Sequence, residues 1–310
     1  MKIHITKINE SWIIDRIKEE FIKFSHFKFS NFYQLSNIVW VIAPWSFEIN
    51  KIKKLKNKKI IYSIYHIENQ DIYSDDIKSI KEIDKYIDCY HVISIETKNI
   101  LEGLTNKPIY YLPLWVNQNI WYFISEKNHL REKYNLSKDD YLVGSFQRDT
   151  EGSDLKSPKL VKGPDIFIKI VKELHTSKPN LRVILAGTRR GFVINELEKI
   201  GIPFSYFEMA DYETTNELYN ILDLYLVTSR LEGGPQALVE CGITKTPIIS
   251  TDVGLASEIL SPESIFDMNN LKTFHLAKPN TKYAFEKASL LTIPSGLNGY
   301  VKMIEEIYES

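Results

Sequence analysis

The chain has 310 residues, 44% of them hydrophobic, so it is long enough for two domains with separate cores. A formal net charge of −1 excludes a general attraction to nucleic acid. The only cysteines, Cys89 and Cys241, form no CxxC pair, which favours reduced thiols in a reducing compartment. Residues 1–30 mix charges unlike a signal peptide, and no apolar run reaches the ~18 residues of a membrane span. We expect a cytoplasmic protein.

Apolar runs of strand length alternate with helical patterns along the chain, which predicts parallel sheets built from β-α-β units. In the first part, strands are expected at 2–6, 38–43, 60–64, 90–95 and 109–112, and helices at 11–24, 47–56, 75–87 and 97–104. In the second part, strands are expected at 141–146, 182–185, 204–207, 224–227 and 248–251, and helices at 164–175, 193–200, 214–222 and 235–243.

The polar segment 121–138 separates the two series and marks the expected domain junction. A last amphipathic helix, near 297–308, follows a Pro-Ser-Gly break and need not pack on the preceding unit. We therefore predict a first domain at 1–120, joined by the C-terminal helix 297–310, and a second domain at 121–296.

The most informative segment begins with the strand expected at 224–227. It leads into Gly233, Gly234 and Pro235, and then into a helix of small residues. A helix N-terminus after a tight turn presents unpaired backbone N–H groups and a positive dipole end, which together suit an anion. Proline in the first turn fits, because its missing N–H would have no intrahelical partner.

Two acids frame this anion site. Glu232 precedes the turn, and Glu240 lies about two helical turns later, so both can face one crevice. A phosphate site flanked by carboxylates suits a phosphorylated ligand rich in hydroxyls, such as a nucleotide sugar.

Two cations are expected at the same sheet edge. Arg148 ends the strand 141–146, and Lys162 precedes the next helix. Ligands of open α/β sheets bind at the carboxyl ends of the strands, and an arginine with a lysine matches a diphosphate. The alternative is two ordinary surface cations. After the next strand, Gly187 and Thr188 form a turn that allows close approach of a ligand.

The segment SRLEGGPQALVE (229–240) resembles the Glu-x7-Glu signature of retaining glycosyltransferases of family 4. The spacing from Gly144 through Arg148 to Lys162-Gly163, the strand and turn VILAG (183–187), and the segment PIISTDVG (247–254) resemble further parts of that family in the right order. The resemblance covers most of residues 141–260. It implies the GT-B fold, an α/β architecture of two Rossmann-like domains whose parallel sheets face a central cleft.

The resemblance also implies roles for single residues. Glu232 would contact the transferred sugar and Glu240 the ribose, while Arg148 and Lys162 would clamp the diphosphate. The distal phosphate would meet backbone amides of the turn and helix start, and the nucleobase would lie near the loop after strand 204–207. The further donor-binding residues are Gly187, Thr188, Met209, Ala210, Gly233, Gly234, Gln236 and Ala237.

The first domain resembles the family less closely. His66, after the strand 60–64, is similar to a family histidine beside the reacting sugar, and its alternative is a partly buried structural histidine. His91 lies within an apolar strand, where we expect a core role. Family members usually have a glycine-rich turn after the first strand, yet residues 7–12 contain none and the first glycine of the chain is Gly103.

The basic run from Lys51 to Lys59 (KIKKLKNKK) has two interpretations. It could contact an anionic membrane, at the inner membrane surface, or a lipid-linked acceptor. The alternative is a solvated helix face. We favour this second interpretation, because runs of charged residues are usually solvated.

The resemblance predicts a retaining glycosyltransferase that moves a sugar from a nucleotide-diphosphate donor to a glycan or lipid-linked acceptor. No cofactor and no metal are expected, because fixed cations would stabilise the leaving diphosphate. The alternatives are another GT-B enzyme, such as an epimerase or phosphorylase, and a non-catalytic nucleotide-sugar-binding protein.

Overall fold

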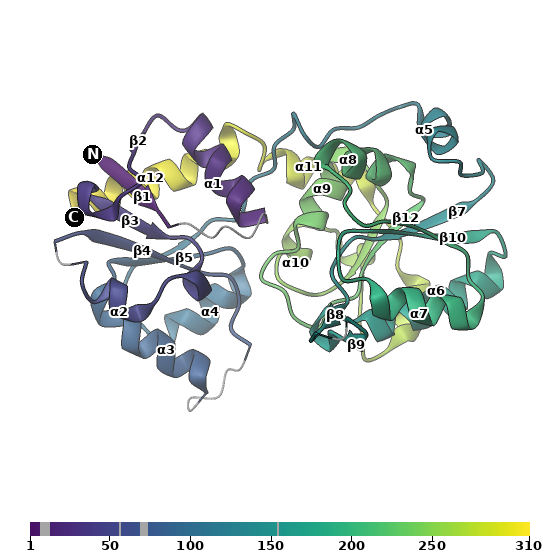
Figure 1. The fold of residues 1–310 in the computed structure, drawn as a ribbon, viewed down its shortest axis with the longest axis horizontal. Helices are drawn as coiled ribbons and strands as arrows, with labels where there is room; N and C mark the ends of the chain where they lie inside the picture. The colour runs from purple at the N-terminus through teal and green to yellow at the C-terminus, as the bar shows by residue number, and fades with distance from the viewer. Residues whose placement is uncertain (7–12, 56, 69–73, 154) are drawn as a thin grey trace. The chain divides into compact units, whose positions relative to one another are not determined.

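The computed structural model describes residues 1–6, 13–55, 57–68, 74–153 and 155–310. The chain forms two compact units: Met1–Trp115 with Leu291–Ser310, and Val116–Leu290. Both unit boundaries fall a few residues before the predicted domain boundaries. Each unit is built around one six-stranded parallel sheet with helices on both faces, which confirms the predicted α/β class of two Rossmann-like units (Figure 1).

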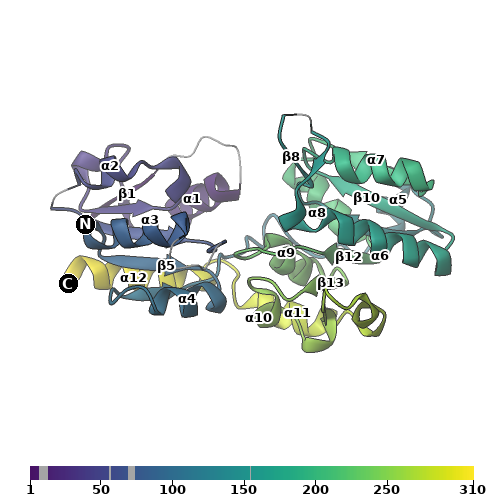
Figure 2. The ribbon, with the colours of Figure 1, turned by 90° about the horizontal axis from the view of Figure 1, so that it is seen from below.

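The first unit has the strand order β2-β1-β3-β4-β5-β6. Its strands are β1 (Lys2–Ile5), β2 (Lys28–Phe29), β3 (Ile38–Val41), β4 (Lys59–Ile64), β5 (Cys89–Val92) and β6 (Ile109–Tyr111). Its helices are α1 (Ile13–Phe24), α2 (Ile49–Ile52), α3 (Asp75–Ile83), α4 (Ile95–Glu102) and α12 (Asn298–Glu309). Helices α1 and α12 cover one face of the sheet, and Figure 2 shows α2, α3 and α4 across the other.

Strand β3 shows why this sheet is covered on both faces. All four of its residues are buried. Ile38 and Trp40 pack in the core beneath α1 and α12, whereas Val39 and Val41 pack in the core beneath α2, α3 and α4. Successive side chains of a strand point to opposite faces, so a continuous apolar run needs a helical layer on each side.

The C-terminal helix α12 completes the first core. Its residues Met303, Ile304 and Ile307 are buried there. The hydroxyl of Tyr300 donates to the backbone oxygens of Leu112 (2.8 Å) and Pro113 (3.2 Å) after β6. The end of the chain is therefore part of the first unit.

The second unit has the strand order β11-β10-β7-β12-β13-β14. Its strands are β7 (Tyr141–Ser145), β10 (Leu181–Ala186), β11 (Phe204–Phe207), β12 (Leu224–Val227), β13 (Ile248–Thr251) and β14 (Ile265–Phe266). A two-stranded hairpin, β8 (Thr150–Glu151) with β9 (Ser157–Pro158), follows β7.

The helices of the second unit are α5 (Lys127–Lys133), α6 (Pro164–Ser177), α7 (Gly191–Ile200), α8 (Tyr212–Ile221), α9 (Gln236–Thr244), α10 (Ala256–Ile259) and α11 (Thr281–Ser289). Helices α6 and α7 cover one face of the sheet, while α8, α9 and α11 lie on the other (Figure 1). The chain leaves β7 toward β10 and β11, then returns to build β12, β13 and β14 on the opposite side of β7. This reversal between β7 and β12 is where open α/β sheets bind ligands.

Most predicted strands and helices match observed elements, and the departures have local causes. The helix predicted at 47–56 is wrong in length: α2 covers only Ile49–Ile52, because the lysine-rich sequence supplies Ile52 and Leu55 as its only buried apolar residues among those described. Helix α5 lies inside the polar segment taken as a junction and is not predicted, since it buries only Leu130 and Arg131. Helix α11 and the short strands β2 and β14 are also absent from the prediction. Residues 7–12 lie outside the described structure.

His91 is a core residue, as predicted. It has no exposed surface. Its Nε2 lies 2.9 Å from the backbone oxygen of Leu112, so Nε2 carries the proton, and Nδ1 accepts from the hydroxyl of Ser63 at 2.8 Å. The indole N–H of Trp40 donates to that same hydroxyl at 2.9 Å. Burial lowers the pKa of His91 to about 4.

This lowered pKa predicts acid sensitivity of the first unit. Between the ordinary histidine pKa of about 6.5 and the lowered value of about 4, the unfolded chain binds a proton that buried His91 does not. The free energy of unfolding therefore falls by up to ~1.4 kcal/mol per pH unit as pH decreases through this range. We expect His91→Gln to reduce this slope, measured by hydrogen exchange of β4 and β5 amides at several pH values between neutrality and mild acid. The control is His129→Gln at an exposed site. Equal slopes in the wild type and His91→Gln would contradict this account.

Candidate functional site

The candidate site lies in the second unit, at the carboxyl ends of β7, β10 and β12. We call it the switch edge: residues 146–149 after β7, 160–163 before α6, 187–190 after β10 and 228–237 after β12. These segments flank the point where the strand order reverses, so the topology alone brings them to one edge of the sheet.

Lys162 and Glu232 meet at the switch edge. Lys162 Nζ lies 2.5 Å from Glu232 Oε1, and the two side chains are 24% and 13% exposed. The hydroxyl of Ser229 is 3.0 Å from Glu232 Oε1 and 3.2 Å from Gln147 Oε1. The Gln147 amide in turn donates to the backbone oxygen of Lys162 at 2.8 Å. The predicted cation and the predicted acid therefore belong to one partly buried polar network.

Backbone contacts fix the segments that carry this network. Gly163 has φ +62°, and a Cβ atom there would lie 1.8 Å from the oxygen of Thr228. The Thr228 hydroxyl donates back to the oxygen of Gly163 at 2.9 Å. Gly254 has φ +53°, and its Cβ would lie 2.5 Å from the oxygen of Gly233. Only glycine allows both this backbone conformation and such close approach.

An arginine at the exit of β12 adds a side-chain link between the same segments. Arg230 forms a two-pronged ion pair with Asp165 in the first turn of α6, at 2.8 and 2.7 Å. It also donates to the backbone oxygen of Leu160 at 2.6 Å. This hydrogen-bonded ion pair lowers the pKa of Asp165. The loop after β12 is thus held against the start of α6 by both backbone and side chains.

Arg148 is half-buried in the loop after β7, next to an ion pair that the sequence did not reveal. Arg190 is completely buried and lies 2.7 Å from Asp149 Oδ2. Arg190 also donates to the backbone oxygens of Ser145 (2.5 Å) and Ala186 (3.2 Å) at the ends of β7 and β10. Burial raises the pKa of Asp149, and the charge of Arg190 opposes that shift. The pair fixes both the loop that carries Arg148 and the turn after β10.

The predicted nucleobase side of the site lies along β10 and β11. Gly187 has φ +81° immediately after β10, and Thr188 beside it is exposed. Met209 follows β11 with 82% of its surface exposed, and Ala210 is half-buried. These residues follow two neighbouring strands, and their contact with a nucleoside stays a prediction.

The helix after the glycine pair begins one residue later than predicted. Pro235 is the residue before the first turn of α9, which starts at Gln236. Gln236 is buried, while Gly234 and Ala237 are half-buried. The structure therefore has a helix start directly after the glycine pair and Pro235, and most residues of α9 are buried.

Glu240 and Glu232 have different partners. Glu240 is 6% exposed, and its Oε2 accepts a hydrogen bond from the hydroxyl of Tyr219 at 2.9 Å. Burial first, and the Glu240 charge second, raise the pKa of Tyr219 well above its ordinary value, so this phenol stays a donor. Glu240 is thus a buried, oriented carboxylate rather than a solvated helix residue.

His66 lies in the first unit, directly after β4. Its side chain is 41% exposed, and its Nε2 lies 3.4 Å from Glu68 Oε1. The described structure thus places an accessible histidine at the carboxyl edge of the first sheet. The glycine-free loop expected to approach the ligands, residues 7–12, lies outside the described residues.

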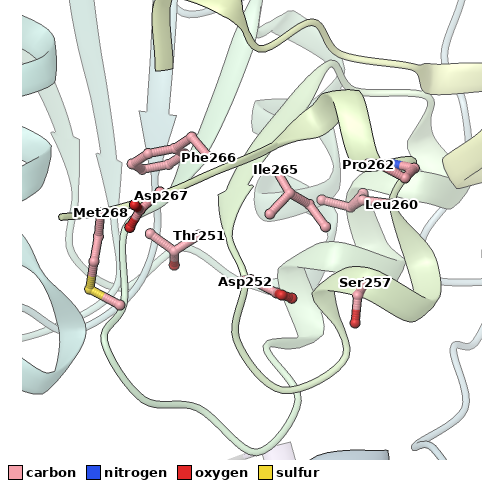
Figure 3. Close-up of a pocket in the computed structure, with 9 residues that line it drawn as sticks. All are labelled: Thr251, Asp252, Ser257, Leu260, Pro262, Ile265, Phe266, Asp267 and Met268. Atoms are coloured by element: carbon pink, nitrogen blue, oxygen red, sulfur yellow. The ribbon is translucent and has the colours of Figure 1, made fainter. Parts of the chain in front are cut away.

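A pocket of about 530 Å³ lies beside the switch edge, and the sequence predicts none of its residues as site residues. It is found at the carboxyl ends of β13 and β14 (Figure 3). Its lining residues are Thr251, Asp252, Ser257, Leu260, Pro262, Ile265, Phe266, Asp267 and Met268. The sequence signal is weak, because only Thr251 and Asp252 belong to a segment of the family resemblance (247–254), and the lining comes together only through the order β12-β13-β14.

Most lysines of the run that the structure describes form ion pairs or hydrogen bonds with other residues of the first unit. Lys51 pairs with Glu48 (3.0 Å), and Lys53 with Glu82 (2.7 Å). Lys59 lies 3.5 Å from Asp88, and Lys58 donates to the backbone oxygens of Gln34 and Ser36. Lys56 lies outside the described residues. Membrane contact through this run stays a prediction.

Two kinds of feature are absent from the described part of the chain. Across the described ranges, no three His, Cys, Asp or Glu side chains group as a metal site would require. None of the helices that the structure describes combines the length and the apolar character needed to cross a bilayer.

The chain has the two-domain Rossmann-like fold of known GT-B glycosyltransferase structures. Anabaena HepE in complex with UDP has a TM-score of 0.75 at 12% identity, over 100% of both chains. Sucrose-phosphate synthase from Thermosynechococcus elongatus has a TM-score of 0.72 at 14% identity, over 98% of this chain and 81% of that one. A glycosyltransferase from Rickettsia africae ESF-5 has a TM-score of 0.63 at 16% identity, over 98% of this chain and 84% of that one. At these identities the likeness shows the fold.

Sequence comparison adds a family match within the second unit. Residues 156–289 match the family described as Glycosyl transferases group 1, a stretch that includes Lys162, Glu232 and Glu240. The lipopolysaccharide core biosynthesis mannosyltransferase LpsB of Rhizobium meliloti (strain 1021) is 28% identical over 107 residues, 32% of this chain. The match spans 30% of the length of that relative. These matches support the glycosyltransferase superfamily expected from the sequence.

The glycine contacts predict a contrast between two substitutions. Gly163→Ala would combine left-handed strain with a clash against the Thr228 oxygen, so we expect the free energy of unfolding of the second unit to fall by about 3 kcal/mol. Gly201→Ala is the matched control, since Gly201 has φ +72° but no atom within 4 Å of the place that a Cβ would occupy. It should cost about 1 kcal/mol. Urea unfolding checks both values, and equal losses would contradict the close-approach argument.

Proposed function

We propose that this protein is a nucleotide-sugar-dependent glycosyltransferase of the retaining family 4 type. It transfers a hexose from a nucleotide diphosphate to a hydroxyl of a glycan or lipid-linked acceptor. The observation that carries the proposal is the network of Lys162, Glu232, Ser229 and Gln147 at the switch edge, within and beside the segment that matches the group 1 family.

The ion pair gives the donor a binding mechanism. A diphosphate brings negative charge to an edge where Lys162 already has a carboxylate partner. Phosphate oxygens compete for the ammonium, and Arg148 supplies a second cation from the loop after β7. Glu232, still held by Ser229, is then available to accept hydrogen bonds from hydroxyls of the transferred sugar. Donor binding and sugar recognition are coupled through one salt bridge.

The same groups favour the chemical step. When the bond between the sugar carbon and the diphosphate breaks, the electron pair remains on the departing diphosphate. Lys162, Arg148 and the amides at the start of α9 would stabilise that charge without rearranging. The acceptor oxygen forms the new bond to the sugar carbon, and the proton of the acceptor hydroxyl passes to an oxygen of the departing diphosphate. We propose that fixed cations fill this role without a metal ion and without a further cofactor.

Glu240 and His66 have proposed roles as well. Glu240, oriented by Tyr219, would accept hydrogen bonds from the ribose hydroxyls. His66 would lie beside the reacting sugar, supplied by the first unit. Gly187, Thr188, Met209 and Ala210 would border the nucleoside.

Donor binding is tested first with UDP, because the related fold of HepE was solved with UDP and with UDP-glucose. We expect UDP-, GDP- or ADP-sugars to raise the Tm. For the base that binds, Lys162→Met should weaken affinity about 10- to 100-fold, the value of one or two charge-assisted hydrogen bonds. Lys172→Met, which removes an exposed charge from helix α6, the helix that follows Lys162, is the control and should leave affinity unchanged. Unchanged affinity in Lys162→Met would overturn the diphosphate clamp.

Transfer is tested separately from binding. Glu232→Gln should retain or strengthen nucleotide affinity, because it removes the carboxylate charge that competes for Lys162. It should lose about 100-fold or more in turnover, because the proposed role of Glu232 in transfer concerns the sugar. Release of free nucleotide, in the presence and absence of EDTA, measures turnover and metal dependence together. Donor binding without any transfer or hydrolysis by the wild type would favour the non-catalytic alternative. Full turnover by Glu232→Gln would contradict the role of this residue.

A further inference from the structure

The pocket at the carboxyl ends of β13 and β14 is separate from the groups expected to bind the diphosphate. Its volume, about 530 Å³, lies in the range of ligand sites in proteins. Its lining combines an apolar part, which includes Leu260, Ile265 and Phe266, with a polar part, which includes Asp252 and Ser257. In Figure 3, Leu260 and Ile265 lie above the side chains of Asp252 and Ser257.

The charge of the lining limits what can bind. Asp252 and Asp267 are its only ionisable side chains, and no lysine, arginine or histidine contributes among the described residues. An anionic group such as a phosphate would be repelled by these carboxylates and would lack a counter-charge. The ligand is therefore neutral or cationic, unlike the diphosphate expected at the switch edge.

The polar groups of the lining are arranged to accept and donate hydrogen bonds. Within the described residues, neither the Asp252 carboxylate nor the Ser257 hydroxyl has a side-chain partner, and both residues are exposed. One oxygen of Asp267 accepts from the backbone N–H of Asn269 at 2.9 Å, which orients that carboxylate. Carboxylates beside an apolar surface match a sugar ring, whose hydroxyls point outward and whose C–H groups form an apolar face.

The wall of the pocket is joined to the switch edge. The hydroxyl of Thr251, a lining residue, donates to the backbone oxygen of Ser229 at 2.6 Å. The Ser229 side chain contacts Glu232. Gly254, between Asp252 and Ser257 in the chain, packs on the backbone of Glu232 and Gly233. A ligand in this pocket would therefore contact the same backbone that supports the proposed sugar-binding acid.

We propose that this pocket binds a neutral pyranose ring, and that the ring belongs to the glycan acceptor at a position remote from the reacting hydroxyl. The assignment to an acceptor rests on the proposed function, whereas the sugar chemistry of the pocket does not. Asp252 and Ser257 bind ring hydroxyls, and the partly exposed Ile265 packs against the C–H face.

The experiment measures sugar binding directly, without donor and without turnover. Neutral hexoses, neutral hexose disaccharides and glucose 6-phosphate are compared by saturation-transfer NMR on the full chain. We expect signal from the neutral sugars, stronger for disaccharides than for monosaccharides if the ring is part of a glycan, and no signal from the phosphorylated sugar that Ser257→Trp removes. If disaccharides gave no stronger signal than monosaccharides, the assignment to a glycan acceptor would be overturned. The pocket would then be a site for a free sugar.

Two variants locate the binding. Asp252→Asn keeps the shape and removes the charged acceptor, so we expect about 10-fold weaker binding. Ser257→Trp places a large side chain at an exposed position of the rim and should abolish the signal. Glu286→Gln, an exposed acid on α11 outside the pocket, is the control. UDP affinity, measured on each variant, should remain at the wild-type value.

The outcomes separate this proposal from the proposed function. Loss of sugar signal in Ser257→Trp with normal UDP affinity supports the pocket. Undiminished sugar signal in Ser257→Trp, or no signal from any neutral sugar, overturns it even if UDP binds. Sugar binding in the absence of any nucleotide binding would instead overturn the glycosyltransferase assignment and retain the pocket.

Discussion

The candidate site depends on backbone segments that touch where a side chain would prevent contact. Gly163 approaches the oxygen of Thr228, and Gly254 approaches the oxygens of Glu232 and Gly233. The first contact joins the segment before α6 to the segment after β12, and the second joins the loop after β13 to that same segment. Loops at the ends of strands would otherwise adopt many conformations, at a cost of ~1–2 kcal/mol per residue to order. The glycines remove that freedom by packing, so Lys162 and Glu232 meet before any ligand binds.

Two ion pairs at the same edge illustrate two uses of charge. Arg190 and Asp149 have 0% and 3% of their side-chain surfaces exposed, so removal of either partner would leave a buried charge unpaired. This pair is suited to hold loops in place. Lys162 and Glu232 are 24% and 13% exposed, and water and an incoming anion can compete for them. This second pair is suited to exchange partners. Burial, rather than residue type, distinguishes the structural pair from the one proposed to bind a ligand.

The sequence predicted the central strands well because these are continuous apolar runs covered by helices on both sides, as in β3 and β12. It also placed Lys162 and Glu232 at one edge, since strand ends meet there whatever the side-chain details. It could not identify Arg190 as the partner of Asp149, because the two lie 41 positions apart and no periodic pattern links them. The pocket at β13 and β14 could not be predicted from the sequence for a similar reason, because its lining depends on the order of the strands in the sheet. Helix α5 was not predicted because its sequence is almost entirely polar and has no apolar periodicity.

The two units contain similar sheets, but different kinds of contact hold their parts together. The second unit joins its loops through glycine backbone contacts, which suits an edge that must approach a ligand closely. The first unit has no glycine before Gly103 and is joined inside by side chains: Trp40, Ser63 and His91 form a buried chain that ends on the oxygen of Leu112, where Tyr300 of α12 also donates. Such a network specifies one packing of the core without requiring close backbone approach. The lack of glycine before Gly103 is therefore compatible with a well-defined fold of the first unit.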